Sequence, residues 1–173
     1  MRRKKNLEHY RQGENGRVEY TGSYTQILLE EEAFAKGMRR QLGAGLCVLA
    51  LLIGAGCVPG TGMEGHFYLL FPYAAELILC VLQIRCIWDA KREGLRQRRY
   101  FYEKNQANLR GMTWGLWILC VWVLAGTAWL LIRGKAAADG AGACLLLISQ
   151  ASGALTEFLA LRRPVPPARE VQG

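Results

Sequence analysis

Four long apolar segments dominate the pattern of hydrophobic and polar positions along the chain. Residues 41–58 and 111–132 contain no charged side chain, and residues 67–88 and 141–161 are of similar length with a few polar interruptions. Runs of about 18 or more apolar residues are typical of membrane-spanning helices. The sequence therefore predicts an all-α membrane protein with four transmembrane helices in a bundle.

The polar interruptions do not overturn this prediction. Glu76, Gln83 and Arg85 lie in the second segment, and Gln150 and Glu157 lie in the fourth. A charged side chain at a helix centre costs about 3 kcal/mol on insertion scales, whereas each Leu, Ile, Phe or Val returns about 0.3 to 0.6 kcal/mol. Because the second segment contains about ten such apolar residues, its insertion is roughly neutral or favourable.

The remaining residues form short polar segments. Residues 1–40 contain the stretch "TQILLEEEAFAKGMRRQL", which predicts a short amphipathic cytoplasmic helix at the membrane interface or docked on a partner. The residues expected on its apolar face are Ile27, Leu28, Phe34, Ala35 and Met38.

Upstream of that stretch, "NGRVEYTGSYT" favours either a small hairpin or no ordered structure. Residues 162–173 are rich in proline and are expected to form an extended cytoplasmic tail. The predicted organisation is therefore an N-terminal segment 1–40, a transmembrane domain 41–161 and the tail.

The distribution of Lys and Arg predicts the orientation in the membrane. Residues 1–40 contain nine of these cations, residues 89–110 contain seven and the residues after 161 contain three, against two in residues 133–140 and none in residues 59–66. Cytoplasmic segments accumulate Lys and Arg. We therefore expect a plasma-membrane protein with both termini in the cytoplasm.

The same cations account for the net charge of +8. Basic residues next to a membrane attract anionic lipid headgroups, so headgroup contacts are expected at Arg92, Arg96, Arg98 and Arg99. The basic and aromatic stretch "KREGLRQRRYFYEK" also fits nucleic-acid binding. We favour the membrane explanation, because it also explains the charge distribution, and we expect no nucleic-acid partner.

Catalytic and metal-binding motifs are largely absent from the sequence. The stretch "GTGMEG" matches the dinucleotide-binding pattern G-x-G-x-x-G, but it lies between two predicted membrane helices rather than between a strand and a helix. The six cysteines fall in the apolar segments without C-x-x-C spacing, and there are only two histidines. We therefore expect no enzyme activity, no cofactor and no metal site.

Glu76 is the strongest candidate for a functional residue. It is the tenth residue of the second segment and Gln150 is the tenth of the fourth. Both segments are expected to run from outside to inside, so the two side chains lie at a similar depth and can meet. Ionisable residues inside membranes are often functional, although a structural role in helix packing is the simpler alternative. The candidate intramembrane polar site comprises Glu76, Gln83, Ser149, Gln150, Thr156 and Glu157.

Small residues along the first segment predict close helix association. They recur at spacings of three and four residues, which places them on one helical face. These residues are Gly43, Cys47, Ala50, Gly54 and Cys57. They favour assembly with further copies of the chain or with other membrane proteins.

Two functions fit these features. The first is a non-enzymatic subunit or accessory protein of a membrane complex. The alternative is a small oligomeric transporter or channel with a polar path around Glu76 and Gln150. The sequence slightly favours the first.

Overall fold

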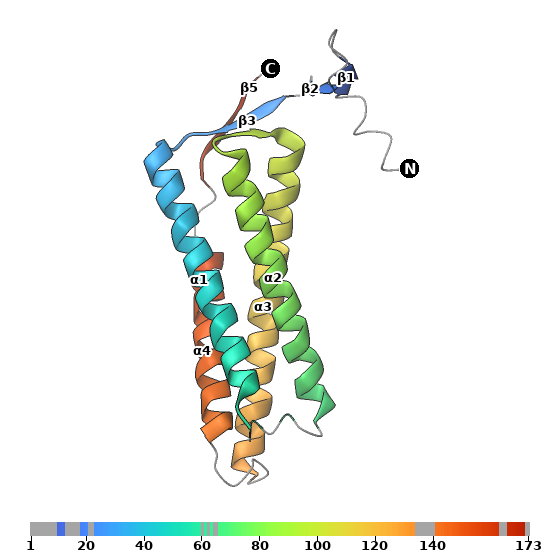
Figure 1. The fold of residues 1–173 in the computed structure, drawn as a ribbon, viewed down its shortest axis with the longest axis vertical. Coiled ribbons are helices and arrows are strands. Elements are labelled where there is room, and N and C mark those ends of the chain that lie inside the picture. Colours follow the sequence, from blue (N-terminus) through green and yellow to red (C-terminus); the bar gives the residue numbers. More distant parts are fainter. Residues whose placement is uncertain are drawn as a thin grey trace.

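The computed structural model of the chain describes residues 10–12, 18–20, 23–59, 61, 63, 66–133, 141–162 and 166–171. These residues include the helices α1 (Glu31–Cys57), α2 (Phe67–Glu93), α3 (Arg99–Ile132) and α4 (Ala141–Leu161). All four helices are long and apolar enough to cross a membrane, which confirms the prediction of four such segments. They lie side by side along one long axis (Figure 1).

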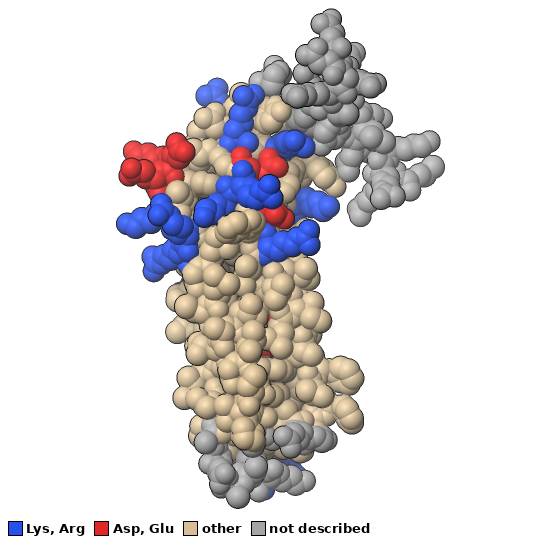
Figure 2. Space-filling view, viewed as in Figure 1, with Lys and Arg blue, Asp and Glu red and all other residues tan. Residues whose placement is uncertain are grey.

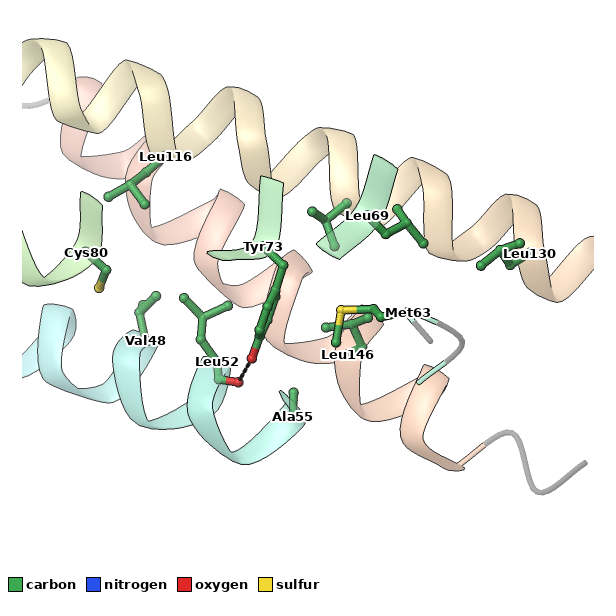
Figure 3. Close-up of a cluster of buried hydrophobic side chains, with 11 residues drawn as sticks. Val48, Leu52, Ala55, Met63, Leu69, Tyr73, Cys80, Leu116, Leu130 and Leu146 are labelled. Carbon is green, nitrogen blue, oxygen red and sulfur yellow. Dashed lines mark hydrogen bonds between the residues drawn. The ribbon is translucent and has the colours of Figure 1, made fainter. Parts of the chain in front are cut away.

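Each helix packs against two neighbours. α1 and α3 each contact both α2 and α4, so α2 and α4 lie diagonally opposite each other. From Thr113 to Leu130 the buried residues of α3 follow one another at spacings of three and four, which keeps a single face turned inward. Part of the apolar core appears in Figure 3, where the Tyr73 hydroxyl of α2 donates a hydrogen bond to the backbone carbonyl oxygen of Leu52 in α1.

The outward faces of the helices are also apolar. Large hydrophobic side chains are exposed on all four helices. Exposure of so much apolar surface to water is unfavourable, whereas contact of the same surface with lipid is not. Examples are Leu46, Leu51 and Ile53 on α1, Phe71, Ile78 and Val81 on α2, Ile118 and Trp122 on α3, and Ile148, Leu155 and Leu159 on α4.

Three helices extend beyond the predicted apolar segments. α1 begins at Glu31 instead of residue 41, α2 continues to Glu93 instead of residue 88, and α3 begins at Arg99 instead of residue 111. α4 spans the same residues as the fourth predicted segment. All three extensions lie at the same end of the helices, so the expected middle loop of residues 89–110 is mostly helical (Figure 1).

A three-stranded antiparallel sheet lies at this end of the helices (Figure 1). Its central strand is β3 (Tyr24–Ile27), flanked by β4 (Arg96–Arg98) and β5 (Ala168–Val171). The sheet thus joins three distant parts of the sequence: the segment before α1, the connection between α2 and α3, and the segment after α4.

Gly94 permits the sharp turn from α2 into β4. Its φ angle of 77° lies in the left-handed region that favours glycine. Its backbone N–H donates a hydrogen bond to the carbonyl oxygen of Ala90 and so ends α2. The buried Gln97 side chain then donates hydrogen bonds to the carbonyl oxygens of Ala90 and Gly94, which fixes β4 against this turn.

The prediction of a separate amphipathic helix before the first apolar segment is wrong in its position. Residues 24–27 form strand β3, and residues 31–40 belong to the continuous helix α1. Ile27 and Phe34, which were expected on the apolar face of that helix, are both buried in the chain itself.

Two further predictions concern the segments on either side of the helices. Upstream, β2 (Val18–Tyr20) lies in the stretch considered for a hairpin, but its antiparallel partner is β1 (Tyr10–Gln12), which precedes that stretch. The expected extended tail contains β5 and is paired with β3 instead of being free in solvent.

Candidate functional site

A stripe of buried residues on α2 carries two polar side chains into the space between the helices. The buried positions recur at alternating spacings of four and three, so they occupy one helical face. They are Leu69, Tyr73, Glu76, Cys80, Gln83, Ile87 and Ala90. Glu76 is completely buried and Gln83 is 6% exposed, so both lie in the interior formed with the other helices.

The facing stripe on α4 carries a matching set of polar residues. Gln150 is completely buried, and Ser149 and Glu157 are 2% and 4% exposed. The hydroxyl of Ser149 donates to the carbonyl oxygen of Leu146 in its own helix. That of Thr156, which is only partly buried, donates to Ser152 in the same way. These two hydroxyls are therefore used within α4 and do not reach Glu76.

The structure brings Glu76 and Gln150 into direct contact, as their equal depth predicts. The Gln150 Nε2 amide donates a hydrogen bond of 2.7 Å to Glu76 Oε2. Among the described residues, neither the second carboxyl oxygen, Glu76 Oε1, nor the amide oxygen, Gln150 Oε1, has a hydrogen-bond partner. We call Glu76 and Gln150 the first pair.

A second pair forms between Gln83 and Glu157. Gln83 Nε2 donates hydrogen bonds to Glu157 Oε2 at 2.9 Å and to Thr113 Oγ1 of α3 at 3.0 Å. The Thr113 hydroxyl in turn donates to the carbonyl oxygen of Leu109. Thr113 was missing from the predicted site. The available signal was its spacing: it lies seven residues before Cys120 and fourteen before Thr127, which places all three on the same buried face of α3.

The two pairs are reciprocal. In the first pair α2 supplies the acid and α4 the amide, whereas in the second pair α2 supplies the amide and α4 the acid. In both pairs the partners are 74 residues apart in sequence. Since α2 and α4 are diagonal, each pair crosses the centre of the helices, and the seven residues between the pairs correspond to about 10 Å along the axis.

Two buried cysteines lie between these pairs. Cys80 of α2, which lies between Glu76 and Gln83 in sequence, and Cys120 of α3 are each 1% exposed. Cys80 Sγ also lies 3.7 Å from the carbonyl oxygen of Gly45. Within the described part of the chain, no three His, Cys, Asp or Glu side chains come together as a metal site.

The two pairs lie in the packed interior, where Glu76, Gln83, Gln150 and Glu157 are at most 6% exposed. A hollow at the end of the helices away from the sheet is lined by Gly56, Cys57, Val58, Pro59, Thr61, Met63 and Leu70. None of the six predicted site residues belongs to this lining. The two pairs are therefore enclosed by packed helices in this structure.

The four arginines expected to contact headgroups lie at the sheet end, where Lys and Arg side chains gather in Figure 2. Arg92, Arg96 and Arg98 are exposed. The Arg96 guanidinium lies 4.4 Å from the ring centre of Tyr24. On the face shown in Figure 2, such cations lie where the apolar body of the protein begins.

Two carboxylates neutralise Arg99. Its guanidinium contacts Glu103 Oε1 at 2.8 Å and Glu170 Oε1 at 2.5 Å. Hydrogen bonds with Glu103 and then Glu170 raise the pKa of Arg99 above its usual value. The contact with Glu170 joins the start of α3 to strand β5, which gives Arg99 a structural role that its position in sequence does not reveal.

Comparisons with family models, with curated proteins and with solved structures found no match for this chain.

Proposed function

We propose that the chain is a multi-pass integral membrane protein whose four helices cross the bilayer as a bundle, and that it serves as a non-enzymatic subunit or accessory protein of a membrane complex. The observation that carries this proposal is the combination of apolar outward faces on all four helices with an enclosed interior. Lipid covers such faces at no hydrophobic cost. An enclosed interior suits a structural component better than a conduit.

We further propose that the sheet end lies in the cytoplasm of a plasma-membrane protein. The sheet collects the N-terminal segment, the α2–α3 connection and the C-terminal segment at one end of the helices. These are the segments richest in Lys and Arg, as expected for the cytoplasmic side. Exposed Arg92, Arg96 and Arg98 would then contact anionic headgroups, whereas Arg99 would mainly hold β5 in place.

The face of α1 that carries Gly43, Cys47, Ala50, Gly54 and Cys57 supports a partner within the membrane. All five of its residues are exposed, so no other helix of this chain covers them. A Cβ atom added at Gly43 or Gly54 would meet no atom within 4 Å. Close approach of another helix along such a face is a common mode of membrane association. The proposed partner is a further copy of the chain or another membrane protein.

Native mass measurement tests this proposal. The full chain would be extracted from its own membranes in mild detergent, and the mass of the protein complex compared with 19.3 kDa for one chain. We expect a larger complex of fixed stoichiometry, which Gly54→Leu weakens and Ala151→Leu, on the exposed face of α4, leaves intact. A single chain of 19.3 kDa at every detergent concentration would contradict the proposal.

Side-specific labelling tests the orientation. Cysteines would be introduced singly at Pro59 and at Lys91, two exposed positions at opposite ends of α1 and α2, in a background without the native cysteines. With an impermeant maleimide on intact cells we expect labelling at position 59 only. Labelling of both positions from the same side would exclude the proposed topology.

A small transporter or channel is the second candidate function. The unpartnered oxygens of Glu76 and Gln150 favour it, because an unsatisfied polar group in a membrane interior is a candidate binding site. In proteoliposomes, a proton or solute flux that disappears in Glu76→Gln would support this function. Equal flux in empty vesicles and in vesicles containing the protein would count against it.

A further inference from the structure

The first pair contains two buried oxygen atoms that have no donor. Glu76 Oε1 and Gln150 Oε1 are unpartnered, and both residues are completely buried. An amide oxygen accepts hydrogen bonds only, and so does each oxygen of an ionised carboxylate. Both unpartnered oxygens are therefore hydrogen-bond acceptors that lack a donor. Buried polar atoms are rarely left in this state.

In the part of the chain that the structure describes, the surroundings of Glu76 supply no buried positive charge to balance an ionised carboxylate. The titratable side chains nearby include Tyr73 and Cys80 on α2 and Cys120 on α3, none of which becomes a cation. Among the described residues, no Lys, Arg or His is buried with it. The buried residues that α1 and α4 contribute to this interior add one further acid, Glu157, and no base.

A metal cation is a poor fit to the same position. Hard cations such as calcium take six to eight oxygen ligands. The first pair offers two free oxygens, and the described residues contain no metal-ligand cluster. A water molecule could donate to both oxygens, but it would leave the charge of the carboxylate uncompensated.

We propose that the first pair is a proton-binding site, in which Glu76 carries a proton on Oε1 and donates it to Gln150 Oε1. One proton removes the charge of the carboxylate and gives both unpartnered oxygens a partner. Together with the bond from Gln150 Nε2 to Glu76 Oε2, it closes a ring of two hydrogen bonds between the carboxyl and the amide. This inference rests on the proposed membrane location, where water does not reach the pair.

Infrared spectroscopy of the full chain in lipid nanodiscs tests the proton directly. With glutamate labelled by ¹³C at the side-chain carboxyl, a protonated carboxyl and a carboxylate give separate bands. At neutral pH we expect Glu76→Gln to remove a protonated-carboxyl band, whereas Glu32→Gln, at an exposed position on α1, leaves that band unchanged. If Glu76→Gln removes carboxylate bands instead, Glu76 is ionised and the proposal is wrong.

Exchange of the two residues provides an independent test. The second pair already has the acid on α4 and the amide on α2, so the double variant Glu76→Gln/Gln150→Glu copies an arrangement present in the same protein. We expect this variant to keep a protonated-carboxyl band and to melt within about 4 °C of the wild type.

The single variant Gln150→Glu completes the comparison. It places two carboxyls together, and both can bond in the ring only while each is protonated. Unfolding releases one proton from the exchanged variant and two from the single variant, so we expect the melting temperature of both to fall as the pH rises above about 4.5, about twice as steeply in the single variant. Equal losses in the single and the exchanged variants would overturn the proposal. Recovery of a water-soluble chain without detergent would instead contradict the membrane location, whatever the spectra show.

Discussion

The first and second pairs use the same residue types between the same two helices, yet they differ in how completely they are bonded. Gln83 donates to both Glu157 and Thr113, and the Thr113 hydroxyl continues the hydrogen bonds to the backbone of α3. Glu76 and Gln150 share one hydrogen bond and leave two oxygens unpartnered. The second pair joins three helices, whereas the first joins two.

This difference suggests different roles for the two pairs. A polar group bonded to several helices fixes their relative positions, because each bond has to be lost when one helix moves. A pair with unpartnered oxygens contributes less to that positioning and retains capacity for a further hydrogen or ligand. We therefore assign helix positioning mainly to Gln83 and its partners, and proton binding to Glu76.

The largest expected effect comes from truncation of the first pair. Glu76→Ala should destabilise the folded chain by about 2 to 4 kcal/mol, because it opens a cavity at a fully buried position and leaves the Gln150 amide without an acceptor. Reversible unfolding in mixed micelles measures the change. Glu76→Gln preserves the volume and serves as the control, with a loss expected below about 1 kcal/mol. An equal loss in both variants would show that the cavity is not the cause.

The contact between α4 and α3 beside the two buried cysteines can also be broken. A Cβ atom at Gly153 would lie 3.2 Å from Cys120 Sγ and 3.7 Å from Val48 Cγ1. Gly153→Leu should therefore overpack the interior and destabilise the chain by about 1 to 3 kcal/mol. Gly54→Leu, on the outward face of α1, is the matched control in excess detergent, where partners are diluted. If Gly153→Leu unfolds at the wild-type midpoint, the packing between the pairs is looser than described.

A smaller effect is expected in the second pair. Gln83→Leu removes the hydrogen bonds to Thr113 and Glu157 at a similar side-chain volume. Hydrogen bonds between membrane helices average about 0.6 kcal/mol, so we expect a loss of about 1 to 2 kcal/mol in the same unfolding measurement. Thr113→Val removes only one of these two bonds and should cost about half as much. A larger loss for Thr113→Val than for Gln83→Leu would contradict the assignment of Gln83 as the centre of this pair.

The smallest expected effect is the coupling between the two pairs. Because they lie about 10 Å apart along the helices, the losses in Glu76→Ala and Gln83→Leu should add to within about 0.5 kcal/mol. A double-mutant cycle measures the difference. The cycle within the first pair, using Glu76→Ala and Gln150→Ala, should show a clearly larger coupling. Strong coupling between the pairs would mean that both belong to one network.

The apolar parts of the fold were predictable because hydrophobicity is a local property. Four uninterrupted or nearly uninterrupted segments are enough to identify four helices, and α4 has the bounds expected for it. The polar extensions of α1, α2 and α3 carry no such signal, because helical turns in water need not be hydrophobic. The sheet was missed for a different reason: β3 pairs with strands about 70 and 145 residues away, and strands of three or four residues have almost no pattern of their own.

The candidate site was predictable only in part. The prediction that Glu76 and Gln150 meet, which was based on their equal depth in two helices of the same direction, is confirmed by their hydrogen bond. The same separation of 74 residues relates Gln83 to Glu157, but both were placed in the candidate site without a prediction that they pair. The unpartnered oxygen Glu76 Oε1 and the ion pair of Arg99 with Glu170 depend on how the side chains are oriented. The position of a residue along its helix does not determine that orientation.

The strand order of the small sheet also constrains biogenesis. β3 precedes the first helix, β4 lies midway along the chain, and β5 follows the fourth helix, yet β3 sits between the other two. In the proposed membrane topology, the sheet can close only after all four helices have crossed the bilayer. A chain in which one helix failed to cross would hold β3 and β5 on opposite sides, so closure of the sheet would distinguish complete insertion from insertion of only three helices.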